Sequence, residues 1–537
     1  MKKSILALLA ATLCTLGATA QTIIFGGEVV SPANMSHMEA AKYGNTEHTF
    51  LSSRVAAMGG AFTSLGADIS SMAINPAGLG MFRTSALSVS VAFDRTRSNS
   101  DTQAGTASKS NFGFNQLGTV LNLYQSSGSL VSVSVGFGYN QLADLSFRNS
   151  GRWDNGEVTI GEFFAEQMYG IDPTALNSSA DPFRNNNIYV DEWGGILAYQ
   201  TYLIDPALGE DKKFLGNYIV SGVPLENRVD SRLNVESDGS VGEYDFSMGF
   251  NFGNILYLGT TLTVQDIVQN IFYNFEESYD GASGAEELTY TGYTPIVSTY
   301  GSGVNFKIGA IVRPIAPLRL GIAFHTPTAM SITRDYSATM ETHFANGDGY
   351  VKNSLLSSYG YTYTSPAKLL LGVSYALSNK ALISVDYDRV WYGGMRMRTR
   401  GLEELFEQDV ETDLGTASNF RAGVEVRPFS SLYLRGGYAY YGSPLNSAAT
   451  KYNDDGNPFY GTYKTHSTHY SFGAGWRFAS GSSLDVVCTL SSAHYTNSVM
   501  YYYSYTDAST NINVSGPTMN NTKHSSTTIG VTYNVLF

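Results

Sequence analysis

The chain has 537 residues, a formal net charge of −13 and 15% charged residues, whereas soluble domains usually carry about 25% charge. The acidic balance argues against nucleic acid as a partner. Glycine (55), tyrosine (37) and phenylalanine (28) are abundant, which is typical of a sheet with one face against lipid. The mean hydropathy of −0.11 fits such a sheet, because only alternate residues of a transmembrane barrel face the lipid.

Residues 1–20 have the features of a signal peptide. A pair of lysines precedes a mostly apolar stretch, and Ala18-Thr19-Ala20 fits a small-residue cleavage site, so the mature chain is expected to begin at Gln21. The apolar stretch is too short to be retained as a spanning helix. Cleavage leaves Cys488 as the one cysteine, which excludes an internal disulfide and a cluster of thiolate metal ligands.

Alternation of apolar and polar residues recurs along the chain, for example over 87–94 and 131–140. In the resulting order every short turn follows an even-numbered strand, so all short turns lie on one side, as in outer-membrane barrels. The sequence predicts an all-β fold, a transmembrane antiparallel β-barrel of about 14 strands. It occupies 85–537, with strands at 85–96, 111–125, 129–147, 243–252, 255–272, 296–313, 318–334, 366–377, 381–396, 416–427, 431–442, 466–479, 483–498 and 524–537.

The last strand shows this pattern most clearly. Ile529, Val531, Tyr533, Val535 and Phe537 share one face, and polar or small residues share the other. The chain stops on Phe537, with Tyr533 four residues earlier on the same face. This ending resembles the signal by which outer-membrane barrels engage the barrel assembly machinery; the alternative is an ordinary amphipathic edge strand. The expected location is the outer membrane of a Gram-negative cell.

Residues 21–84 precede the first strand and lack its period of two. The segment is rich in small residues, and its Gly-Gly and Asn-Pro steps would break short helices. We interpret it as a small helical hatch that folds back and plugs the lumen; the alternative is a periplasmic tail. The residues expected to shape or gate this hatch are Gly59, Gly60, Asn75, Pro76, Ala77 and Gly78.

A long excursion, expected at the extracellular side, covers about 149–242. The stretch 160–169 and a second stretch that begins near Trp193 have helical apolar spacing. Exposed apolar side chains in such a loop would form a landing site for a greasy ligand, and the alternative is that they pack against the rim of the barrel. The candidate loop contacts are Phe163, Phe164, Met168, Trp193, Ile196 and Leu197.

No arrangement of catalytic or metal-binding residues is discernible. His466 and His469 are three residues apart at the start of a strand, so they are expected to point to opposite faces. Residues 453–457 resemble part of a calcium loop but lack the downstream bidentate Glu, and a solvated turn explains them better. We therefore expect no enzymatic activity, no cofactor and no metal.

Two segments before the first strand, Met58-Gly59-Gly60-Ala61 and Asn75-Pro76-Ala77-Gly78-Leu79, resemble the hatch of the FadL/TodX-type outer-membrane transporters of long-chain fatty acids and aromatic hydrocarbons. In that family the hatch plugs a fourteen-stranded barrel. Shorter fragments extend the resemblance along the chain: 318–327, 366–368 with 372–375, Asp386-Tyr387 and 434–444. The excursion after the third strand also lies where the family has a long ligand-capturing loop.

The resemblance implies passive transport of a hydrophobic small molecule. A ligand would meet an apolar groove in the long loops, move to a pocket inside the barrel, and leave sideways into the bilayer when the hatch moves and the third strand kinks. That strand carries Gly136 and Gly138 and becomes polar at Asn140, so a bulge or kink is expected there; ordinary barrel curvature is the alternative.

The sequence leaves other functions open. A general porin would hold charged rings in an open lumen and would not need the glycine-patterned hatch, and a surface adhesin or structural barrel would use the excursion as an interaction surface. Haem uptake has weak support, since no sequence feature demands haem. The expected partners are the hydrophobic ligand, outer-membrane lipid and the assembly machinery. A monomer is expected because a closed barrel has no free edge strand.

Overall fold

A computed structural model describes twelve stretches of the chain: 35–44, 51–102, 105–156, 158–207, 213–216, 229–280, 287–399, 410–446, 463–499, 504–506, 513–515 and 518–537. The expected signal peptide lies outside these residues, as does the loop at 453–457. Within them, no helix is long and apolar enough to cross a membrane.

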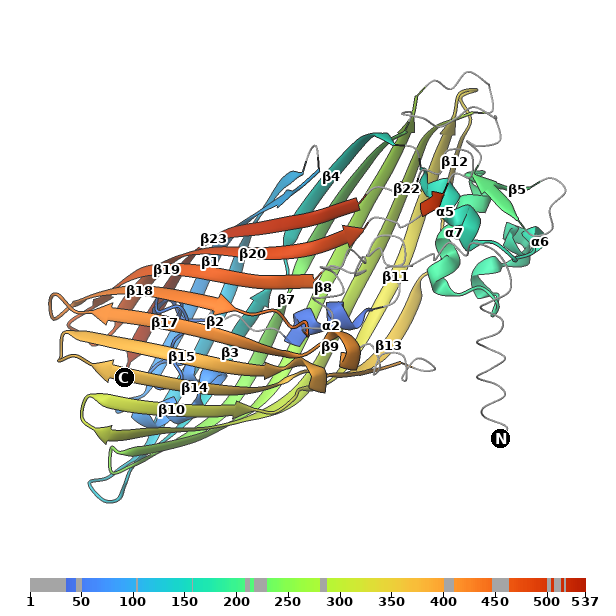
Figure 1. Cartoon of the computed structure of the whole chain (residues 1–537). Coiled ribbons are helices and arrows are strands. Elements are labelled where there is room, and N and C mark those ends of the chain that lie inside the picture. The colour runs from blue at the N-terminus through green and yellow to red at the C-terminus, as the bar shows by residue number, and fades with distance from the viewer. Residues whose placement is uncertain are drawn as a thin grey trace, which may run out of the picture.

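One large antiparallel sheet closes on itself (Figure 1). Several of its strands are interrupted once and continue as a second element. In order round the barrel the strands are β1 (Ala86–Ser100), β2 (Thr106–Gln125), β3 (Leu130–Asp144) with β4 (Phe147–Gly156), β7 (Val229–Phe252), β8 (Leu256–Tyr279), β9 (Leu288–Ile315), β10 (Leu318–His325) with β11 (Ala329–Phe344), β14 (Ala367–Ala376) with β13 (Ser357–Thr364), β15 (Ala381–Trp391) with β16 (Arg396–Arg398), β17 (Thr416–Val426), β18 (Leu432–Tyr441), β19 (Tyr463–Arg477), β20 (Ser483–Val499) and β23 (Thr518–Leu536).

Closure comes from β1 and β23, which pair from Ala86↔Leu536 to Ser100↔Thr522. Fourteen strands therefore form a closed barrel, and the predicted fold class is confirmed. The short strand β12 (Gly349–Asn353) pairs with β11 on the same edge as β13 and so continues that strand of the wall. β21 (Ser504–Thr506) pairs with β22 (Asn513–Ser515).

The alternation seen in the sequence becomes two faces of the wall. On β1, Leu87 and Phe93 are 44% and 46% exposed, whereas Ser88 and Ser90 are 2% exposed. The same outward apolar band continues on β23 and β20. An outward apolar band and an inward polar face are the pattern of a transmembrane barrel, and the expected outer-membrane location agrees with this fold.

The N-terminal segment (the described residues 35–44 and 51–84) lies on the luminal side of the wall. It contains α2 (His37–Gly44), α3 (Ser53–Ala57), α4 (Ser71–Ile74) and the 3-10 helix η2 (Pro76–Met81). η2 packs against β7, β8 and β9, and α3 packs against β18, β19, β20 and β23. Because it contacts strands from widely separated parts of the ring, the segment crosses the lumen.

A compact cap, formed by the described residues 158–207 and 213–216, lies at the end of the barrel away from the C-terminus (Figure 1). Its elements are α5 (Ile160–Gln167), α6 (Pro173–Leu176), η3 (Ser178–Ala180), η4 (Pro182–Arg184), η5 (Val190–Glu192), α7 (Trp193–Gln200), β5 (Ile204–Pro206) and β6 (Phe214–Gly216). Residues 149–156 and 229–242, which we expected in the excursion, instead extend the wall as β4 and β7. The remaining short helix, η6 (Tyr392–Gly394), follows β15.

Candidate functional site

Asn75 joins the N-terminal segment to the barrel wall. Its side-chain Nδ2 donates to the carbonyl of Thr63 at 2.7 Å and is 3.3 Å from the carbonyls of Ala310 in β9 and Ile322 in β10. Its Oδ1 accepts from the backbone N–H of Ala77 at 3.1 Å and caps η2. A buried amide with four polar neighbours holds its position strongly, because losing one partner would leave a buried polar group unsatisfied.

The other predicted hatch residues occupy tight positions. Gly59 and Gly60 have φ of +64° and +75°, a left-handed backbone that suits glycine. A Cβ on Gly59 would lie 2.7 Å from the carbonyl oxygen of Tyr438 in β18, and one on Gly78 would lie 2.5 Å from Ser71 Oγ. Pro76, Ala77 and Gly78 form the first turn of η2, and all are buried.

Two further contacts attach the segment to the wall at other strands. The backbone N–H of Thr63 donates to Asp386 Oδ2 at 2.8 Å, and Arg421 forms an ion pair with Asp386 at 3.4 Å. On the other side, the backbone N–H of Ser53 donates to Thr532 Oγ1 at 2.7 Å. The wall thus holds the segment through polar side chains, which can exchange partners, and through apolar packing, as in the cluster of Met72 and Leu79 with Val120 of β2, and not through a backbone ladder.

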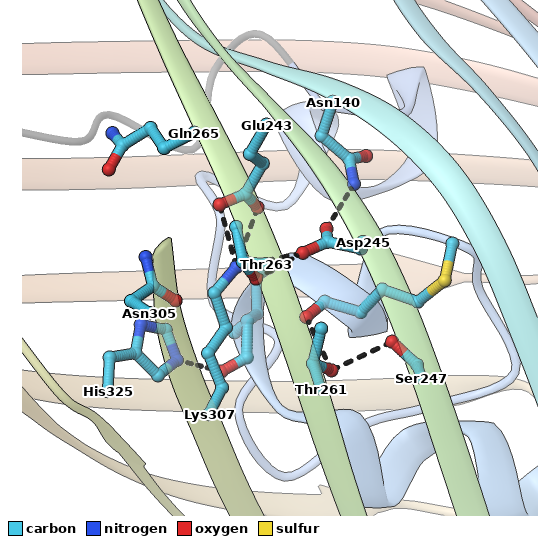
Figure 2. A network of polar contacts seen from close by, with 12 residues as sticks. Asn140, Glu243, Asp245, Ser247, Thr261, Thr263, Gln265, Asn305, Lys307 and His325 are labelled. Atoms are coloured by element: carbon cyan, nitrogen blue, oxygen red, sulfur yellow. Dashed lines mark hydrogen bonds and ion pairs between the residues drawn. The ribbon is translucent and has the colours of Figure 1, made fainter. Parts of the chain in front are cut away.

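A charged network lies beside this junction (Figure 2). Lys307 Nζ lies 2.7 Å from both carboxylate oxygens of Glu243 and 3.4 Å from Asp245 Oδ1. Asn140 donates to Asp245 Oδ2 at 2.9 Å, and His325 Nε2 lies 2.9 Å from the carbonyl of Ile74 in α4. The network therefore connects β3, β7, β9 and β10 with the N-terminal segment.

A cavity lies between α2 and this network. Tyr43 and Gly44 of α2 line one side and Ala73 of α4 another, with Lys307, His325 and Lys368 on the wall. The helix α2 itself sits in an apolar cluster rich in methionine and tyrosine, with Met35, Met38, Met330, Met395, Met397, Tyr361 and Tyr363 among its members. Sequence reasoning did not identify this helix as a separate feature.

Polar contacts also hold α2 in this cluster. Glu39 accepts from Arg334 Nη1 of β11 at 2.7 Å, with both side chains almost fully buried. Tyr43 OH donates to Gln269 Oε1 at 2.8 Å, and Tyr363 OH donates to the carbonyl of Ala40 at 2.9 Å. An apolar setting with a few directed polar contacts is also the usual composition of a small-molecule site.

The third strand parts from the second within the wall. The β2–β3 ladder runs only from Gln125↔Ser132 to Gln116↔Asn140, whereas β2 continues to Thr106 paired with β1 alone. The β3–β7 register also shifts between Gln141 and Ala143. This interruption, at Asn140 and just beyond it, lies where the third strand was expected to kink.

Gly136 and Gly138 lie on β3 against the N-terminal segment. A Cβ on either would lie within 2.7 Å of the Met72 side chain in α4. These glycines therefore make room for the N-terminal segment against β3, and the interruption begins beyond them. Side chains cover the interrupted region: Asn111 donates to Asp144 Oδ2 at 3.0 Å, and Ser100 Oγ donates to the carbonyl of Ser150 in β4 at 3.2 Å.

The six candidate loop contacts are all buried in the cap. Each is at most 5% exposed, in one apolar core that the cap shares with β7, β8, β9 and β11: Phe163, Phe164, Met168, Trp193, Ile196 and Leu197. The rings of Phe164 and Tyr293 are 5.4 Å apart, edge to face. Of the two alternatives, the structure shows packing against the barrel, so none of the six is an exposed landing site in this conformation.

The remaining predicted residues lie on the outer wall or far from one another. Tyr533 on β23 and Phe537, which directly follows that strand, are 42% and 66% exposed. His466 stacks on His494, with ring centroids 5.0 Å apart, whereas His469 is 3% exposed. Among the described residues, no group of three or more His, Cys, Asp or Glu is placed to hold a metal ion.

Comparison with solved structures shows which known fold this barrel has. A Pseudomonas aeruginosa FadL homologue aligns over 91% of this chain and 98% of its own, with 11% identity and a TM-score of 0.50. The chain has the fold of the FadL-type outer-membrane transporters. The Ralstonia pickettii toluene transporter TbuX (14% identity, 91% and 98% coverage, TM-score 0.48) and the monoaromatic hydrocarbon channel CymD (13%, 92% and 99%, 0.46) are also similar. No family model and no curated protein sequence matches the chain.

At the level of fold, the FadL/TodX resemblance seen in the hatch motif is therefore confirmed.

Proposed function

We propose that this barrel carries hydrophobic small molecules, such as a long-chain fatty acid or an aromatic compound, passively across the outer membrane and releases them sideways into the bilayer. The observation that carries the proposal is the end of the β2–β3 ladder at Gln116↔Asn140, on strands that also border the N-terminal segment. An apolar solute gains little from a water-filled pore. A side exit in the wall suits it better.

The first step of the proposed route is entry into the apolar cluster around α2. Methionine side chains are flexible and polarizable, so they adapt to ligands of different shape. Five of them surround or belong to this region. A ligand that displaced α2 would gain the apolar contacts that α2 now makes, and it would break the Glu39–Arg334 pair.

The second step is movement of the plug, for which we propose the N-terminal segment. Its predicted gating residues Gly59, Gly60, Asn75, Pro76, Ala77 and Gly78 lie at its contacts with the wall or its sharp turns. Gln116 Nε2 donates to Asn140 Oδ1 at 2.8 Å and also to Ser70 Oγ at 2.8 Å. Movement of Ser70 would therefore disturb the hydrogen bond between Gln116 and Asn140, the pair at which the β2–β3 ladder ends.

A cross-link across the interruption tests lateral release. A Cβ on Gly113 would lie 3.3 Å from Gln141 Oε1, so Gly113→Cys with Gln141→Cys, in a Cys488→Ser background, would accept a cleavable thiol linker. Uptake of labelled fatty acid and labelled toluene should fall on linking and recover on cleavage. The control joins Leu117→Cys to Tyr139→Cys, which face each other within the intact ladder. Unchanged uptake in the linked test variant would reject lateral release.

Conductance distinguishes a plugged transporter from a general porin. The full-length protein in a planar bilayer should pass little steady ion current, and a variant without residues 21–84 should open a pore. A large stable current through the full-length protein would favour the porin.

If replacing the cap by a short turn leaves uptake unchanged but abolishes cell-surface attachment, the result would favour an adhesin.

A further inference from the structure

A set of basic side chains gathers on one part of the outer wall. Arg95 and Arg97 lie on β1 and Lys523 on β23, and all three are exposed. Their positions continue the outward face of each strand, after Leu87, Val89, Val91 and Phe93 on β1 and after Ile529 on β23. We call Arg95, Arg97, Lys523, His494 and His466 the outer basic patch.

The strand register brings the members of this patch together. Lys523 pairs with Asn99 of β1 on one side and with His494 of β20 on the other. Arg97 is two residues from Asn99, so it is the diagonal neighbour of Lys523, at a Cα separation of about 7–8 Å. His494 pairs with His466 of β19, and their rings stack. Four adjacent strands thus present one continuous basic and aromatic row.

The depth of the patch is set by the direction of the strands. β1 begins at Ala86, opposite the end of the chain, on the side of the short turns. The patch lies toward the other ends of β1, β20 and β23, which is the extracellular side in a barrel of this kind. It begins directly where the apolar residues of β1 and β23 stop, which is where the headgroups of the outer leaflet are expected to lie.

The charge of the patch contrasts with the rest of the protein, whose formal net charge is −13. β11, which lies half-way round the ring from β23 and β1, carries Asp335 and Glu341 on its outer part. Arg95, Arg97 and Lys523 make no hydrogen bond or ion pair within the described part of the chain. Their charges are therefore available to an external anion.

From this geometry we infer that the outer basic patch binds the phosphate groups of an outer-leaflet glycolipid of the lipid A type. Guanidinium groups bind phosphate through paired, charge-assisted hydrogen bonds, and an ammonium group adds a point charge. The acyl chains of the same lipid would lie against the apolar residues directly below, such as Phe93 and Ile529, which are 46% and 48% exposed. One ligand thus satisfies both the charge and the apolar band.

The test measures lipid binding to the delipidated full-length mature protein. Bisphosphorylated lipid A is titrated into mixed micelles and the bound fraction is read by native mass spectrometry. The test variant is Arg95→Gln with Arg97→Gln and Lys523→Gln, and binding should weaken about tenfold or more. The control, Arg232→Gln with Lys352→Gln and Lys380→Gln, removes the same charge elsewhere and should bind like the wild type. Heat-dependent migration on gels confirms that each barrel is folded.

Two further arms identify the source of the phosphate. Dephosphorylated lipid A should bind no better to the wild type than to the test variant, and inorganic phosphate alone should not occupy the patch. Added salt should weaken the binding of bisphosphorylated lipid A to the wild type, because the contacts are exposed charges. Equal binding of that lipid by the test variant and the wild type would overturn the inference. So would an equal loss in the control, or saturable binding of inorganic phosphate.

Discussion

Lys307 Nζ lies 2.7 Å from both carboxylate oxygens of Glu243, and the two side chains are 3% and 1% exposed. The pair joins β9 to β7 across the luminal face of β8, directly beside the N-terminal segment (Figure 2). Removing one partner of a buried ion pair is strongly destabilising because it leaves a buried charge uncompensated, whereas replacing both partners by apolar groups is often tolerated.

Removal of Lys307 alone should therefore be worse than removal of Lys307 and Glu243 together. Lys307→Met alone leaves Glu243 and Asp245 buried without their cation and should lower the free energy of unfolding by about 3–5 kcal/mol. Glu243→Gln alone leaves the contact of Lys307 with Asp245 and should cost less, and the double variant, which leaves Asp245 as the one carboxylate of the three, should recover part of the loss. Urea-induced unfolding of the reconstituted barrel measures all three in a double-mutant cycle. Additive losses in the double variant would show that the two side chains do not act as a pair.

A side chain at Gly249 should displace the N-terminal segment from β7. A Cβ there would lie 2.6 Å from Leu79 Cβ and 2.5 Å from the backbone nitrogen of Gly80, both in η2. Gly249→Val should raise the steady ion conductance in planar bilayers severalfold, because the wall can no longer seat η2. Gly360→Val is the matched control, since a Cβ on Gly360 of β13 would meet nothing within 4 Å. A sealed Gly249→Val barrel would contradict this role of η2.

The cap should be weakened by loss of a buried ring and not by loss of an exposed one. Phe164 is 0% exposed and packs on Tyr293, whereas Tyr189 is 72% exposed. Phe164→Ala should lower cap stability by about 3–5 kcal/mol, and Tyr189→Ala should change it by less than about 0.5 kcal/mol. Limited proteolysis within the cap measures both. Equal susceptibility of the two variants would mean that the cap core does not hold the cap together.

Acid should strengthen the docking of α5 in the cap. Burial, at 5% exposure, raises the pKa of the Glu162 carboxyl from an ordinary 4.5 to about 8, opposed by the hydrogen bond from Thr159 and reinforced by Glu277. Because the folded pKa is the higher one, the stabilisation is complete below about pH 4.5 and is lost as the pH rises through about 8. Hydrogen exchange of residues 160–167 should therefore be better protected at about pH 6 than at about pH 9.5, after correction for intrinsic rates.

The matched variant for this pH effect is Glu162→Gln. A glutamine at this third helical position still accepts the Thr159 N–H and keeps the capping box, but it cannot ionise. Its protection should be nearly independent of pH and should exceed that of the wild type by about tenfold or more at about pH 9.5, the change expected for one pKa unit. The same pH dependence in both proteins would show that another group controls the docking of α5.

The wall of this protein was predictable because its signal is local. An outward residue such as Leu87 and an inward one such as Ser88 are chain neighbours, and lipid on one side and lumen on the other give every strand the same period of two. Each of the fourteen strands overlaps the stretch where the alternation placed it, but β7, β8, β9 and β11 run further than expected, and β4, β12 and β13 extend the wall over residues that the pattern did not assign to strands. The hatch motif was visible for a similar reason, since Gly59 and Gly60 mark a backbone that glycine adopts easily.

The interior was decided by tertiary structure alone. Asn75 contacts Thr63, 12 residues away, but Ser53 contacts Thr532, 479 residues away, and Lys307 meets Glu243 over 64 residues. No local pattern encodes such pairs, because each depends on how closure of the barrel and its shear bring strands into register. The same holds for the cap, where helical spacing predicted α5 and α7 but only packing onto the barrel decided that their apolar faces are buried.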